Sequence, residues 1–132
     1  MRISKIHIKN YRLLEDFVLS PDKNSDFMLC IGRNNVGKTS VLTILDECLN
    51  NEMKGVAFDD ITLKQRNQLI EVLDEYCSGA KSKEDTCLLL STVAPELSIT
   101  IDYSDPASDL SLIPMLSLDD TSQTVTIQLK KL

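Results

Sequence analysis

The sequence predicts an α/β fold, and this prediction depends on two periodic patterns and one unbroken apolar run. Residues 5–10, 97–103 and 125–129 alternate apolar with polar side chains, as half-buried strands do. Residues 41–49 instead repeat apolar side chains at helical spacing. Residues 27–31 are continuously apolar and end at a glycine, which is typical of a central strand covered on both faces. We therefore predict a mixed sheet that includes an antiparallel strand subdomain.

Turn and capping signals add further elements to the first half of the chain. A second strand is predicted over residues 16–19, and residues 51–60 are predicted to form a loop. A helix is expected to begin at Thr62, because Thr62 and Gln65 have the spacing of a capping box. It is expected to end before Gly79, which has the position of a helix-terminating glycine.

The second half of the chain is predicted less completely. Residues 80–85 have the composition of a charged loop, and residues 87–93 form a short apolar run that fits either a helix or a strand. The last two strands are expected to pair as antiparallel neighbours. Residues 104–123 would then form a long connection between them.

The stretch GRNNVGKT at residues 32–39 fits the pattern G-x-x-x-x-G-K-[ST] of phosphate-binding loops, and we call it the phosphate-loop motif. Its glycines let backbone amides close around an anion. Lys38 can reach the terminal phosphates of a nucleotide, and the hydroxyl of Thr39 can bind magnesium. The helix predicted after the motif would direct its free amides and its positive dipole end at the phosphates. The predicted strand, loop and helix are the context that the motif requires.

One family that the motif resembles is that of the ribosome-assembly and septation GTPases, whose loops have the form GRxNVGKSS. These proteins also contain a D-x-x-G segment and an N-K-x-D guanine motif, and neither pattern occurs in this sequence. They usually reach the loop on their first strand, whereas two predicted strands precede it here. A GTPase is therefore the weaker alternative.

A second resemblance includes the strands before the motif. The run ISKIHIKNYRLLEDFVLS, followed by FMLCIGRNNVGKTSVLTIL, resembles the start of RecF-like, structural-maintenance-of-chromosomes-like and overcoming-lysogenization-defect (OLD) ATPases. Ile6, Ile8, Asn10, Tyr11 and Arg12 match the first part of that family pattern, I-x-I-x-N-[FY]-[RK]. The resemblance covers about residues 3–50. It implies a P-loop NTPase lobe from an ABC-type ATPase head, in which two heads sandwich two ATP molecules.

The resemblance also implies which residues bind the cofactors ATP and Mg²⁺. Lys38 and Gly37 would hold the β and γ phosphates, and Thr39 would bind the metal. Arg12 would approach the nucleotide from the first strand, although a solvent-exposed arginine at a strand end is the alternative. The full set of expected cofactor-binding residues is Gly32, Asn34, Asn35, Val36, Gly37, Lys38, Thr39, Ser40 and Arg12.

The motifs needed for hydrolysis are not found in the sequence. Hydrolysis requires a metal-holding carboxylate and a group that orients the attacking water. Two stretches imitate the Walker B strand that supplies them in this family, VLTILDE at residues 41–47 and LIEVLDE at residues 69–75, but both fit helical periodicity. No LSGGQ-like signature motif occurs either. We predict no catalytic residue in this chain.

We therefore predict that residues 1–132 are the N-terminal lobe of an ABC-type ATPase head. The larger protein would hydrolyse ATP in DNA metabolism or phage defence, whereas this part alone would not be hydrolytic. Its expected partners are the remaining C-terminal part, a second head in a head-to-head homodimer, and DNA through the full-length protein. The alternative from another class is a non-catalytic interaction module that uses its acidic second half and exposed strand edges.

Composition limits the location and the metal chemistry of the chain. Fourteen basic and twenty acidic residues give a net charge of −6, which argues against nonspecific nucleic-acid binding by the chain as a whole. No apolar run approaches the roughly 18 residues of a membrane span, so we expect no membrane contact and a cytoplasmic location. The four cysteines lack C-x-x-C spacing and are predicted to be buried thiols. With a single histidine in the sequence, zinc chemistry has no support.

Overall fold

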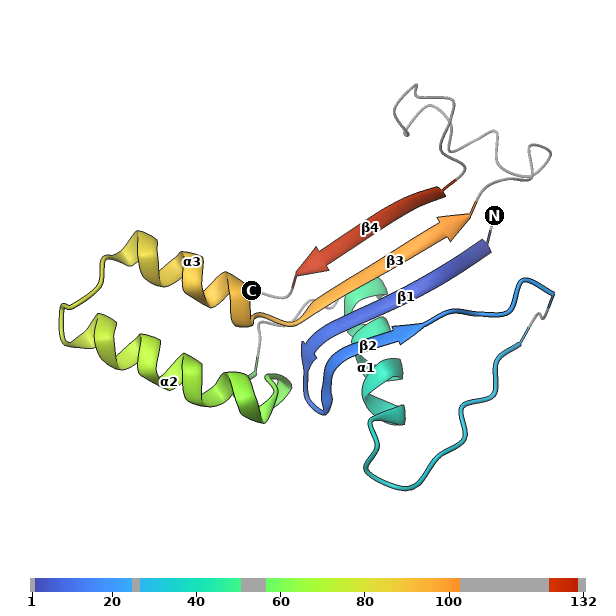
Figure 1. Cartoon of the computed structure of the whole chain (residues 1–132), viewed down its shortest axis with the longest axis horizontal. Coiled ribbons are helices and arrows are strands. Elements are labelled where there is room, and N and C mark those ends of the chain that lie inside the picture. Colours follow the sequence, from blue (N-terminus) through green and yellow to red (C-terminus); the bar gives the residue numbers. More distant parts are fainter. Residues whose placement is uncertain (1, 25–26, 51–56, 103–123, 131–132) are drawn as a thin grey trace.

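The computed structural model describes residues 2–24, 27–50, 57–102 and 124–130. Its strands form one antiparallel sheet in the order β2-β1-β3-β4 (Figure 1). The strands are β1 (Arg2–Tyr11), β2 (Leu14–Leu19), β3 (Glu96–Asp102) and β4 (Thr124–Lys130). The helices of the described residues are α1 (Lys38–Leu49), α2 (Leu63–Cys77) and α3 (Lys83–Val93), with a 3-10 turn, η1 (Phe58–Asp60). The α/β class and the antiparallel pairing of the last two strands are confirmed.

Strand β1 is central because it pairs with β2 on one side and with β3 on the other. Ile8 lies opposite Phe17 of β2 and Leu97 of β3. Along β1, Ile6 and Ile8 are buried, while His7 between them is only half-buried and lies on the other face. This alternation is the period of two that the sequence predicts for a half-buried strand.

Helix α1 covers the buried face of the sheet and completes the main core (Figure 1). Ile44 is 1% exposed and belongs to the same apolar cluster as Ile8 and Leu97, both 0% exposed. Each side chain buried this fully contributes about 1.5–3 kcal/mol to stability. The phosphate-loop motif thus leads directly into the best-packed helix of the described structure.

Helices α2 and α3 lie side by side as a helical hairpin beyond one end of the sheet (Figure 1). Helix α2 begins after Thr62, as predicted, but no capping box forms there, since the Thr62 side chain makes no capping hydrogen bond. The side chain of Gln65 instead donates to Oδ1 of Asn10 at 2.9 Å. This contact couples the start of α2 to the end of β1.

The predicted charged loop at residues 80–85 is wrong in its second half, because α3 begins at Lys83. Ser82 caps this helix by accepting a hydrogen bond from the Asp85 backbone N–H at 3.1 Å. Its hydroxyl also donates to the Asp85 carboxylate at 2.9 Å. An acidic residue in the first turn further stabilises the positive end of the helix dipole. The same polar residues that indicated a loop therefore start a helix.

The predicted central strand at residues 27–31 is not formed. The segment is neither helix nor strand, and the side chains of Leu29 and Ile31 are 74% and 85% exposed. A strand exists only with a neighbour that shares its backbone hydrogen bonds, and no described strand pairs with this segment. The sheet of the described residues is consequently antiparallel throughout, and the mixed sheet that we predicted is not formed by them.

The cysteine prediction is also wrong for most of these residues. Cys30, Cys77 and Cys87 are exposed, and only Cys48 is half-buried. Cys77 is the last residue of α2, Cys87 lies in α3, and Cys30 lies in the segment before the motif. The connection predicted at residues 104–123 falls outside the described residues. Across the described ranges, we find no helix with the length and apolarity of a membrane span.

Candidate functional site

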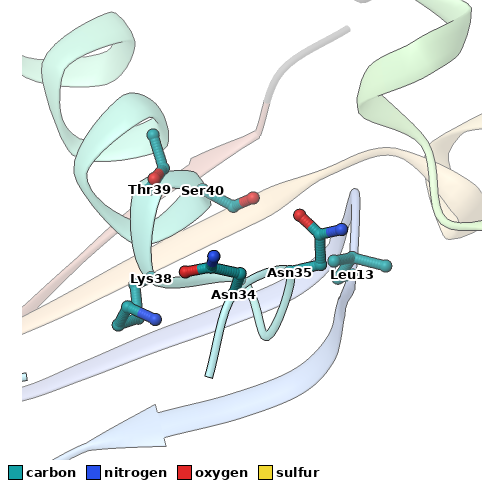
Figure 2. Close-up of a pocket in the computed structure, with 7 residues that line it drawn as sticks. Leu13, Asn34, Asn35, Lys38, Thr39 and Ser40 are labelled. Carbon is teal, nitrogen blue, oxygen red and sulfur yellow. The ribbon is translucent and has the colours of Figure 1, made fainter. Parts of the chain in front are cut away.

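A pocket of about 340 Å³ lies at the N-terminal end of α1 (Figure 2). Its volume is within the range of small-molecule sites, roughly 300–1,000 Å³. The residues that line it are Leu13, Asn34, Asn35, Gly37, Lys38, Thr39 and Ser40. Six of these seven were predicted as cofactor-binding residues from the sequence. The structure therefore brings most of the predicted set around one cavity.

The start of α1 offers its backbone amides to this pocket. Gly37 is the N-cap residue, and no side chain caps the helix. The first turn contains no acidic residue. The first N–H groups of a helix have no partner within the helix, and its dipole places partial positive charge there. An uncapped helix end without acidic neighbours is suited to bind an anion.

Gly37 holds the backbone in a conformation that other residues rarely adopt. Its φ is 94°, and a Cβ at this position would lie 2.8 Å from Cδ2 of Leu14. The turn between β1 and β2 therefore packs directly against the last residue of the loop. Both the positive φ and this close contact require glycine at the position.

Lys38 places its ammonium group inside the curve of the loop. Its Nζ donates hydrogen bonds to the backbone carbonyl of Gly32 at 2.6 Å and to that of Arg33 at 2.5 Å. Within the described part of the chain, no carboxylate forms an ion pair with Lys38. A charged donor held only by neutral carbonyls can transfer its hydrogen bonds to phosphate oxygens.

Gly32 and Val36 belong to the same loop but do not line the pocket. A Cβ on Gly32 would lie 3.2 Å from Cγ2 of Val36 and 3.8 Å from Nζ of Lys38. The two residues thus lie against each other, close to the ammonium group of the lysine. Their predicted direct contact with the nucleotide stays a prediction.

The donor groups of the pocket fit a magnesium ion only in part. Magnesium prefers six oxygen ligands and usually keeps several waters and phosphate oxygens. The lining offers the hydroxyls of Thr39 and Ser40 and the amide oxygens of Asn34 and Asn35, but no carboxylate. Thr39 is exposed at the pocket. It would therefore be one protein ligand of an ion held mainly by phosphate and water, and this role stays a prediction.

Arg12 is engaged away from the loop. Its Nε and Nη2 donate to Oδ1 of Asp60 at 3.1 and 3.0 Å. Arg12 does not line the pocket, whereas its neighbour Leu13 does. The predicted approach of Arg12 to the nucleotide stays a prediction. Sequence reasoning missed both Leu13 and Asp60, because no motif marks either residue.

Tyr11, which precedes Arg12 in the chain, connects β1 to α1. The side chain is fully buried, and its hydroxyl donates to Oε2 of Glu47 at 3.4 Å. Burial raises the pKa of the Tyr11 hydroxyl above its ordinary value, so this group stays neutral. The guanidinium of Arg12 lies 5.0 Å from the centre of the Tyr11 ring.

The two imitations of a Walker B strand lie in helices, as predicted. Residues 41–47 belong to α1 and residues 69–75 to α2. At 1.5 Å per residue, Asp46 and Glu47 would lie about 10–15 Å along α1 from the phosphates. The pocket thus combines anion-binding groups without a carboxylate that could hold metal or orient water. Its chemistry is suited to binding a phosphorylated ligand.

Comparison with known proteins identifies one family. A family model described as an AAA ATPase domain matches residues 1–129. No curated protein matches the sequence, and no solved structure does.

Proposed function

The chain belongs to the AAA ATPase domain family, and from this premise we propose that it binds ATP with magnesium as part of a larger ATPase. The observation that supports this most directly is the pocket at the uncapped start of α1, lined by Lys38, Thr39 and Ser40. Free amides, a lysine and two hydroxyls converge there without an acidic group. This combination favours a chain of phosphates over a neutral or cationic ligand.

We further propose that the larger ATPase is of the RecF, chromosome-maintenance or OLD type and acts in DNA metabolism or phage defence. Support comes from the order of elements. Strand β1 ends at Tyr11, inside the I-x-I-x-N-[FY]-[RK] run, and the turn that follows this strand contributes Leu13 to the pocket. The two halves of the family pattern are thus neighbours in space as well as in sequence.

The segment at residues 27–31 supports the proposal that a further part of the ATPase completes the fold. Its apolar side chains suit a buried strand, yet Leu29 and Ile31 are mostly exposed. Strands from the remaining part would pair with this segment and bring the missing carboxylates to the pocket. A head-to-head homodimer and DNA contact belong to the same proposal, because they require the larger protein. The alternative, a non-catalytic interaction module, would instead use its acidic second half and exposed strand edges, without nucleotide.

An ATP titration of the 132-residue chain tests the binding proposal. The wild type should bind Mg-ATP, and Lys38→Ala should weaken binding by at least about tenfold, because it removes the charged donor of the loop. Lys64→Ala, an exposed lysine on α2, is the matched control and should bind as the wild type does. Binding that survives Lys38→Ala unchanged would contradict an ATP site in this loop.

Two further readouts separate the alternatives. Competition between ATP and GTP should favour ATP, whereas a clear preference for GTP would support the GTPase alternative. Phosphate release by the purified chain should stay at background in the presence of magnesium, because the pocket lacks a carboxylate. Magnesium-dependent turnover would overturn the proposal that this part is not hydrolytic.

A further inference from the structure

Asp60 is a buried acid to which no motif assigns a role. Its side chain is 6% exposed, and its Oδ1 accepts two hydrogen bonds from the guanidinium of Arg12, at 3.1 Å from Nε and 3.0 Å from Nη2. Its backbone carbonyl accepts a third bond, from the Arg12 N–H at 2.8 Å. One residue of η1 therefore holds both the side chain and the backbone of Arg12.

These bonds fix the turn that forms one wall of the pocket. Arg12 has a φ of 50°, in the left-handed region, which surrounding contacts must maintain in a residue other than glycine. The next residue, Leu13, lines the pocket, and Leu14 packs against the position of Gly37. An antiparallel bridge between Tyr11 and Ile61 also holds the end of β1, directly before this turn. The position of this wall thus depends on residues 60 and 61.

The guanidinium of Arg12 is held by two different side chains. A guanidinium has five N–H groups in a fixed plane, and the bonds to Asp60 use only Nε and Nη2. The side chain is 37% exposed, and its plane is supported by the ring of Tyr11 at 5.0 Å. The buried carboxylate of Asp60 on one edge and the Tyr11 ring beside the guanidinium therefore fix the orientation of the arginine before any ligand binds.

We propose that Asp60 is a positioning residue for nucleotide binding, which holds Arg12 and thereby fixes the turn after β1 that forms one wall of the pocket for the phosphates of ATP. This inference rests on the proposed ATP site at the start of α1 and deepens it. Asp60 acts through Arg12 and does not itself touch the nucleotide. Residues 12 and 60 therefore function as one unit in binding.

The test is a calorimetric titration of Mg-ATP into the wild type and three variants. Asp60→Asn keeps the size of the side chain and removes its charge, and the partly exposed Arg12 can then be solvated. We expect about a tenfold loss of ATP affinity from it. Asp59→Asn is the matched control, since the Asp59 side chain is 90% exposed, and it should bind within about twofold of the wild type. Thermal unfolding verifies that each variant is folded.

The third variant distinguishes positioning from a general structural role. If Asp60 acts through Arg12, Arg12→Gln/Asp60→Asn should bind ATP within about threefold of Asp60→Asn alone, because the arginine has already lost its effect. A further tenfold loss in the double variant, or wild-type affinity in Asp60→Asn, would overturn the inference. Equal losses in Asp59→Asn and Asp60→Asn would overturn it too, since net charge would then be the cause. Absence of ATP binding by the wild type would instead overturn the proposed function.

Discussion

Two apolar stretches of this chain have different environments in the structure. Ile8, in the centre of β1, is fully buried on the face of the sheet that α1 covers, whereas Ile31, six residues before the N-cap of α1, is 85% exposed. Both residues belong to runs that the sequence predicts as strands. The difference shows that an apolar sequence pattern makes a segment suitable for burial. Burial itself also requires strands that pair with the segment and a layer that covers it.

The same contrast applies to the two sides of the phosphate-loop motif. On one side the turn after β1 packs against Gly37 and contributes Leu13 to the pocket. On the other side, Leu29 and Ile31 lead into the loop without a covering layer. The start of α1 is therefore fixed by the described sheet, whereas no described strand pairs with the segment that enters the loop.

Replacing the same residue type in both stretches should give the largest difference. Ile8→Ala removes buried atoms and leaves a cavity, so we expect it to lower the free energy of unfolding by about 2–5 kcal/mol. Ile31→Ala should change it by less than about 0.5 kcal/mol, because the side chain is already in water. Urea unfolding followed by circular dichroism measures both values. Equal losses for the two variants would mean that residues 27–31 are packed in solution.

Two glycines with positive φ allow a finer comparison. Gly37→Ala combines an unfavourable backbone conformation with a Cβ 2.8 Å from Leu14, so a loss of about 2–4 kcal/mol in unfolding free energy is expected. At Gly79 the φ is 75° and nothing lies within 4 Å of an added Cβ. Gly79→Ala should therefore cost only about 1–2 kcal/mol.

Thermal and urea unfolding of the two glycine variants test this ranking. Gly37→Ala should also weaken Mg-ATP binding, while Gly79→Ala should leave it unchanged. Should the two variants lose equal stability, the turn after β1 would not be packed against the loop as described. The turn after β1 could then not be described as a fixed wall of the pocket.

The pH dependence of stability gives the smallest expected effect, and it concerns only the side of the loop that packs against the turn after β1. Burial raises the folded-state pKa of Tyr11 above its unfolded value of about 10. The stabilisation that depends on neutral Tyr11 is therefore complete below pH 10. Above it, the unfolded chain ionises first, and stability falls by about 1.4 kcal/mol per pH unit until the folded pKa is reached.

Urea unfolding between pH 8 and pH 11 measures this decline, and Tyr11→Phe is the control. The variant cannot ionise at this position, so its stability should fall less steeply with pH than that of the wild type. Parallel curves for the two proteins would show that Tyr11 is accessible to water in the folded state. The close packing of the turn after β1 would then be in doubt.

Local patterns were sufficient for the elements that pack against one another. The alternation in β1 and β3 and the helical spacing in α1 predicted both the type of element and the buried face. The start of α3 was misjudged because Ser82 and Asp85 occur equally in loops and in helix caps. The segment at residues 27–31 was misjudged because its apolar pattern is that of a central strand. Such a strand needs neighbouring strands, and none of the described strands pairs with this segment.

The candidate site divides in the same way. Residues of the phosphate-loop motif were predicted because their spacing in the sequence is the spacing that the chemistry requires. Asp60 and Leu13 follow no such pattern. Asp60 meets Arg12 across 48 positions of the chain, and Leu13 reaches the pocket only because of the turn after β1. Contacts of this kind depend on the tertiary fold and leave no local signal in the sequence.

The central claim is that ATP binds with its phosphates at the start of α1. The most direct measurement is a two-dimensional ¹⁵N–¹H spectrum of the labelled chain, recorded with increasing Mg-ATP. The account predicts that the largest shifts occur at the backbone amides of residues 34–40. The claim would be contradicted if these amide signals did not shift and the largest shifts occurred instead on the basic face of β1, at Lys5 and Lys9.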